Sequence, residues 1–122
     1  MWRLIALFCW LVLLPAFAVA QTAWPNRPIS LIVPYPPGGS TDNVARPLVQ
    51  EWGKVLGQTV VIENRGGAGG TIGADLVARA RPDGHTLLLF PTAIFTISPH
   101  MMQLPYDVDR AFIPIARVAA SD

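Results

Sequence analysis

Short apolar runs alternate with polar, glycine-rich segments along most of the chain. Three runs rich in branched apolar residues, 29–33, 59–63 and 86–90, have the length and composition of strands buried in a sheet. Apolar residues at helical spacing fill the stretches between them and predict helices over residues 42–56 and 71–80. Strand, helix, strand, helix, strand with short connections predicts an α/β fold, a parallel sheet with flanking helices.

The boundaries of the first helix carry a conflict. Four consecutive residues that favour helix N-caps, Ser40 to Asn43, precede it, and Gly57 is expected to end it. Pro47 lies between these signals, and a proline deep inside a helix costs about 3 kcal/mol. We therefore expect a kink in the first turn, or a start later than the caps indicate.

The pattern weakens beyond Pro91. Residues 92–102 are expected to form a loop followed by a helical turn, and residues 113–119 fit the beginning of another strand. The chain stops at Asp122 without a terminating signal, which predicts that it is a fragment.

The first 20 residues follow the order of a secretory signal peptide. Arg3 supplies a positive charge, residues 4–17 are apolar and uncharged, and Ala18 and Ala20 place small residues where a signal peptidase reads them. The alternative is an uncleaved membrane anchor, but the apolar stretch is shorter than the roughly 20 residues that a spanning helix needs. We predict export, with cleavage after Ala20.

Removing this leader changes the composition. The 122-residue chain is 52% hydrophobic with a formal charge of +1, but the leader supplies much of the apolar content and one arginine. Residues 21–122 then hold equal numbers of acidic and basic residues and no basic run, which argues against nucleic acid as a partner. Cys9 lies in the leader, so the exported part is expected to fold without disulfides.

Two glycine-bearing loops are the strongest candidates for chemistry. Residues 38–42 follow the first predicted strand and residues 66–70 follow the second, so both fall at the carboxyl ends of parallel strands, where ligands bind. Exposed amides at glycines and helix N-termini form a cradle for an anionic oxygen group. Nucleotide fingerprints fail, because Ile72 replaces the third glycine of a G-x-G-x-x-G pattern and the only lysine is Lys54. A bare phosphate stays open, as does simple turn formation by the glycines.

Other residues give weaker signals. Asp42 is expected to cap the helix, with orientation of the first loop as the alternative. His85 and His100 are expected at the surface rather than in a metal site. Trp24 and Tyr35 suit packing over a ligand mouth, and core or lid packing equally. No catalytic set can be assembled, so the sequence predicts no enzyme, no metal and no cofactor.

Three stretches in order, ISLIVPYPPGGSTDNVAR, LGQTVVIENRGGAGGTIGAD and ARPDGHTLLL, resemble the tripartite tricarboxylate transporter receptors, the Bug family of periplasmic solute-binding proteins. The resemblance implies a type II-like periplasmic binding protein whose two lobes close on a small carboxylate, with residues 21–122 as the N-terminal portion of lobe one. It also implies a membrane permease as partner. Members are roughly three times as long, and they often carry another residue type where Gly67 stands.

In that family the first-lobe loops hold a ligand carboxylate through main-chain N–H groups and ordered water. The positions that this role implies here are Gly38, Gly39, Ser40, Thr41, Asp42, Ala68, Gly69, Gly70 and Thr92. Two alternatives remain: an orphan periplasmic sensor or signalling adaptor, and a secreted α/β enzyme whose loops bind an oxyanion.

Overall fold

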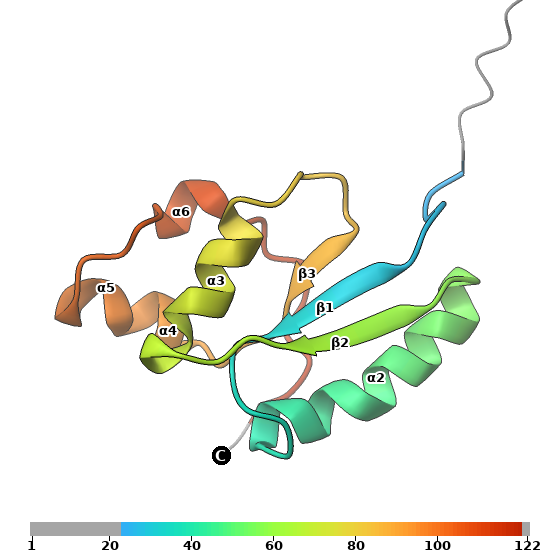
Figure 1. The fold of residues 1–122 in the computed structure, drawn as a ribbon, viewed down its shortest axis with the longest axis horizontal. Helices are drawn as coiled ribbons and strands as arrows, with labels where there is room; N and C mark the ends of the chain where they lie inside the picture. The colour runs from blue at the N-terminus through green and yellow to red at the C-terminus, as the bar shows by residue number, and fades with distance from the viewer. Residues whose placement is uncertain (1–22, 121–122) are drawn as a thin grey trace, which may run out of the picture.

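A computed structural model describes residues 23–120 as a small parallel sheet with helices packed around it (Figure 1). The predicted signal peptide, residues 1–20, lies outside the described residues. The elements in chain order are β1 (Ile29–Val33), α2 (Ser40–Leu56), β2 (Val60–Asn64), η1 (Ala68–Gly70), α3 (Thr71–Ala78), β3 (Thr86–Leu88), α4 (Ala93–Thr96), α5 (Ser98–Met101) and α6 (Val108–Ala111). The predicted α/β class is confirmed.

Strand β1 forms the centre of the sheet. The strand order is β2-β1-β3, and both neighbours pair with β1 in parallel, with Leu31 opposite Ile62 on one side and Leu87 on the other. Leu31 and Ile32, whose side chains point to opposite faces of the sheet, are each 1% exposed, as a strand covered on both faces requires. Removal of this apolar surface from water is the main force that holds the unit together.

The two long crossover helices pack against different strands. Helix α2 lies along β2 and β1, whereas α3 packs against β3 and β1 (Figure 1). The chain moves from β1 outward to β2 and then back across β1 to β3, and right-handed crossovers in opposite directions place the helices on opposite faces. The carboxyl ends of all three strands therefore share one edge, from which the loops emerge.

Helix α2 differs from its prediction at the start. It begins at Ser40, with Gly39 as the N-cap, and no side chain makes a capping hydrogen bond there. The helix begins at Ser40 and runs on through Pro47, so the expected late start is wrong. Pro47 removes the partner of the Asn43 carbonyl, but both residues are exposed, so water can replace the lost bond. Gly57, at φ 64°, ends the helix as predicted.

The C-terminal third is less regular than expected. Two short helices, α4 and α5, follow β3 directly, and α6 was not predicted. Residues 112–120 form no strand, contrary to the expected start at 113–119, and they pair with neither β2 nor β3. Ile113 and Ile115 are consequently 86% and 79% exposed.

His85 lies in the interior, so its expected surface position is wrong, while His100 is exposed as predicted. The Trp24 ring covers His85 edge-on at 5.8 Å between ring centroids. Gly84 leaves room for this cover, because a Cβ at that position would lie 3.0 Å from Trp24 Nε1. His85 precedes β3, so Trp24 lies at the amino-terminal edge of the sheet, away from the glycine loops.

Candidate functional site

The first glycine-bearing loop, residues 34–39 (loop one), leads from β1 directly into the N-terminus of α2. The amides of Ser40, Thr41 and Asp42 have no backbone partner among the described residues, since the first turn of a helix has no preceding carbonyls to accept from them. Seventeen residues of aligned peptide dipoles add a partial positive charge at the same place. Ser40 is exposed and Thr41 partly exposed, so this end of α2 is open to an anion.

Asp42 orients loop one and does not cap α2. Its side chain is completely buried, and its Oδ2 accepts the Gly38 amide at 2.9 Å. Arg46 Nη2 lies 2.8 Å from the same oxygen. The hydrogen bond from Gly38, followed by that from Asn64, holds the pKa of the Asp42 carboxyl below its ordinary value. The capping interpretation is therefore wrong, and the loop-orienting alternative is confirmed.

The second glycine-bearing loop, residues 65–70 (loop two), owes its shape to left-handed backbone. Four consecutive residues have positive φ angles, 127° at Gly67, 46° at Ala68, 67° at Gly69 and 97° at Gly70. The Gly70 amide bonds the Gly67 carbonyl at 2.9 Å, while the amides of Ala68 and Gly69 have no backbone partner in residues 23–120. Both residues are exposed, so loop two presents two further free donors.

The two loops lie against each other. Asn64, the last residue of β2, donates from Nδ2 to the Tyr35 carbonyl at 3.0 Å and to Asp42 Oδ1 at 3.1 Å. The Tyr35 hydroxyl lies 3.4 Å from the Gly69 carbonyl, and burial raises its pKa. The structure thus packs loop one against loop two and ties the start of α2 to the end of β2, from which loop two leads.

Asn64 is a site residue that the sequence analysis did not select, and Tyr35 was selected only for packing. The available signal was weak: a polar amide that follows Glu63 at the end of the strand, at the edge where ligands bind. Nothing in the spacing shows that this amide reaches a helix residue 22 positions earlier in the chain.

Thr92 lies in the segment that follows β3, the third strand whose carboxyl end faces this edge. It precedes α4, its side chain is exposed, and its carbonyl accepts the amides of Phe95 and Thr96. Ile94, two residues on, is buried against Gly70, where an added Cβ would lie 2.6 Å from Ile94 Cδ1. The segment after β3 is therefore packed onto loop two, although no hydrogen bond ties the Thr92 side chain to either loop within the described part of the chain.

The positive potential at this site comes from backbone N–H dipoles rather than from charged side chains. The arginines adjoining the loops are both paired, Arg46 with Asp42 and Arg65 with Glu63 at 2.9 Å. Free amides, which are neutral donors, provide the positive potential. In residues 23–120 no group of three or more His, Cys, Asp or Glu is placed to hold a metal ion, and no helix is long and apolar enough to cross a membrane.

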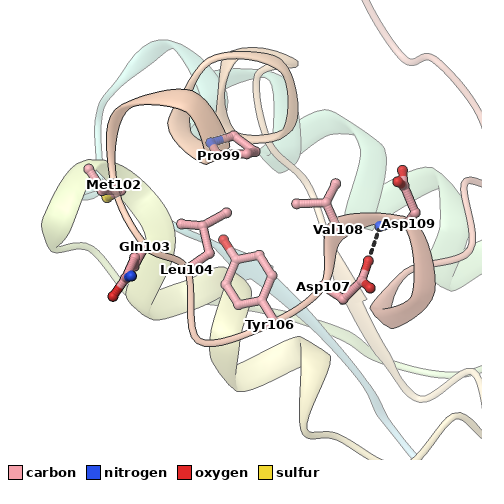
Figure 2. A pocket seen from close by; sticks show the side chains of 8 residues that line it. All are labelled: Pro99, Met102, Gln103, Leu104, Tyr106, Asp107, Val108 and Asp109. Carbon is pink, nitrogen blue, oxygen red and sulfur yellow. Dashed lines mark hydrogen bonds between the residues drawn. The ribbon is translucent and has the colours of Figure 1, made fainter.

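A separate hollow of about 580 Å³ lies between α5 and α6 (Figure 2). Its lining combines apolar side chains with two carboxylates, Asp107 and Asp109, and includes none of the predicted site residues. Those two carboxylates make the hollow a poor place for an anionic ligand. The residues that line it are Pro99, Met102, Gln103, Leu104, Tyr106, Asp107, Val108 and Asp109.

A family model and individual relatives of the chain point to the same group of proteins. Residues 44–122 match the family described as tripartite tricarboxylate transporter family receptor. Protein BugT of Bordetella pertussis is 45% identical over 105 residues, which cover 84% of this chain and 32% of BugT. The chain thus spans about a third of the length of this relative.

Two similar solved structures contain a bound dicarboxylate. MatC from Rhodopseudomonas palustris with bound malate has 42% identity and a TM-score of 0.65, covering 75% of this chain and 31% of that one. Rpa4515 of R. palustris with adipate has 39% identity and a TM-score of 0.57, covering 58% and 24%.

Proposed function

The chain belongs to the tripartite tricarboxylate transporter receptor family, and from that membership we propose that it captures small carboxylates in the periplasm and delivers them to a membrane permease. The observation that carries the proposal is the set of amides at the start of α2 (Ser40 to Asp42) and in loop two (Ala68 and Gly69) that have no backbone acceptor within residues 23–120. Free amides at a helix N-terminus bind a carboxylate without a cationic side chain.

Ligand class follows from the same loops. The start of α2 presents the amides of Ser40 and Thr41, and loop two presents those of Ala68 and Gly69. Two neighbouring amides match the two oxygens of one carboxylate group better than a single polar atom. The malate and adipate bound by the similar proteins are both dicarboxylates, which supports an organic acid with a second carboxylate held elsewhere. We propose a di- or tricarboxylate as ligand.

Ser40 offers a direct test, because proline at the first helical position removes an amide donor while preserving the helix. Gly39 precedes it with extended backbone, φ −73° and ψ 172°, which a following proline accepts. In the full-length protein, Ser40→Pro should weaken the binding of malate or adipate by about tenfold or more, the value of one hydrogen bond to a charged group.

Ser40→Ala is the matched control, because it removes the hydroxyl and keeps the amide. Calorimetric titration of wild type and both variants measures the effect, with dimethyl malate as the ligand lacking charge. Equal affinity of Ser40→Pro and Ser40→Ala would show that the amide does not bind the ligand. Failure of wild type to bind any acid in a broad panel would remove the proposed function itself.

Delivery to a permease and export are parts of the proposal that need cellular tests. Deleting the gene should abolish uptake of the labelled acid that the protein binds, and normal uptake would favour the sensing alternative. The leader predicts that the mature protein begins at Gln21, which N-terminal sequencing of the periplasmic fraction checks directly.

A further inference from the structure

Three hydrogen-bond donors from three different segments converge on the carboxylate of Asp42. They are the Gly38 amide of loop one, the Arg46 guanidinium of α2 and the Asn64 amide at the end of β2. A carboxylate suits this position because both of its oxygens accept hydrogen bonds. An asparagine side chain would place its own NH₂ group against one of the three donors. The group is fully buried, so these bonds are not weakened by competition with water.

Asn64 completes the link between the two loops. Its Nδ2 group bonds both Asp42 and the Tyr35 carbonyl, so one amide joins α2, loop one and the strand that leads into loop two. The last main-chain hydrogen bond between β1 and β2 runs from the Arg65 amide to the Val33 carbonyl, at 2.8 Å. The side chains of Asp42 and Asn64, which we call the loop brace, therefore continue the connection where the sheet stops.

We propose that the loop brace is a positioning device that holds the free amides at the start of α2 and in loop two in their ligand-binding arrangement before the ligand arrives. The inference rests on the proposed function, since it concerns the same site. Loop two has four left-handed residues in succession, three of them glycine, so its intrinsic flexibility is high. Ordering such a loop during binding would reduce affinity, and a preformed brace removes that cost.

The brace can be tested in the full-length protein with Asn64→Ser, which removes the bridging amide and keeps a small polar side chain. We expect about a tenfold or larger loss of malate or adipate affinity, and faster hydrogen exchange of the Gly38 amide measured without ligand. Asn43→Ala is the control, because Asn43 lies beside the same loop but makes only a long, exposed bond of 3.4 Å to Gly38. It should change neither quantity.

A swap provides the rescue. Asn64→Asp alone places two carboxylates together and should bind weakly, whereas Asp42→Asn combined with Asn64→Asp restores a donor and an acceptor between positions 42 and 64. The double variant should recover part of the affinity that Asn64→Asp loses, and this readout applies even if Asn64→Ser folds poorly. No recovery, or wild-type affinity and Gly38 exchange in Asn64→Ser, would overturn the proposal.

The two proposals fail in different ways. If wild type binds no acid, the proposed function fails, and the brace is then judged by Gly38 exchange in unliganded protein. Unchanged exchange in Asn64→Ser would overturn the brace, and faster exchange would support its hold on loop one. If wild type binds and Asn64→Ser binds equally well, only the brace fails.

Discussion

Replacing Gly73 with alanine adds one methyl group where α3 approaches the end of β1 most closely. A Cβ at Gly73 would lie 2.7 Å from the Arg65 carbonyl oxygen, 2.8 Å from Pro34 Cβ and 3.0 Å from Pro34 Cα. None of these atoms belongs to a flexible side chain, so α3 must move away from the sheet. Arg65 begins loop two and Pro34 begins loop one, so the displacement also disturbs the candidate site.

The size of the effect follows from two opposing terms. Overpacking of a tight interior costs about 1–3 kcal/mol, and alanine in a helix is favoured over glycine by up to about 1 kcal/mol. The contacts with fixed backbone place the cost toward its upper end. We therefore expect Gly73→Ala to lower the free energy of unfolding by about 1–2 kcal/mol and to weaken carboxylate binding.

Gly53→Ala in α2 is the matched control, because its Cβ would meet only the Gln58 carbonyl oxygen at an ordinary 3.4 Å. It should raise the free energy of unfolding by up to about 1 kcal/mol and leave affinity unchanged. Urea unfolding of the two full-length variants, followed by tryptophan fluorescence, measures the free energy of unfolding of each. Trp52 serves as a probe because it packs against the core. If Gly73→Ala proves as stable as Gly53→Ala, the close approach of α3 to β1 is refuted.

Three further predictions address other contacts. Gly57→Ala should cost about 1–2 kcal/mol by placing a Cβ in left-handed backbone, with unchanged ligand affinity, as thermal melting and calorimetric titration can show. Ile94→Ala should cost about 2–5 kcal/mol as a core truncation and also weaken binding, because Ile94 supports Gly70; an unaltered melting temperature would contradict this. The depressed pKa of Asp42 stabilises the fold above the ordinary carboxyl value of about 4, and that contribution disappears as the pH falls through the lower folded value. Thermal melts across acid pH should therefore show the advantage of wild type over Asp42→Asn shrinking toward low pH, and a constant advantage would contradict the assignment.

The strands and the two glycine loops were predictable because their signals are local. A buried strand such as 29–33 needs only a short apolar run, and Gly57 marks a helix end by its own backbone preference. In a parallel sheet the loops that follow the strands share one edge, so the strand–helix pattern is sufficient to predict that the two glycine loops are neighbours.

The remaining features depend on contacts between distant residues. Asp42 lies in the first turn of a helix, where capping is the usual role, and only the approach of Asn64 and Gly38 shows that it faces inward. His85 is buried because Trp24 folds over it, which no pattern around His85 indicates. The apolar pattern at 113–119 resembles a strand, but a strand forms only where its backbone pairs with another strand, and this segment pairs with neither β2 nor β3.

The open flanks of the sheet also bear on how this part of the chain behaves when produced by itself. Within residues 23–120, β2 and β3 each pair on one side only, and the irregular C-terminal segment exposes Ile113 and Ile115. Unpaired strand edges next to exposed branched side chains recruit other chains into intermolecular sheets. An isolated recombinant fragment of these residues should therefore self-associate and precipitate as its concentration rises, which makes polar substitution at positions 113 and 115 the first step toward a tractable sample.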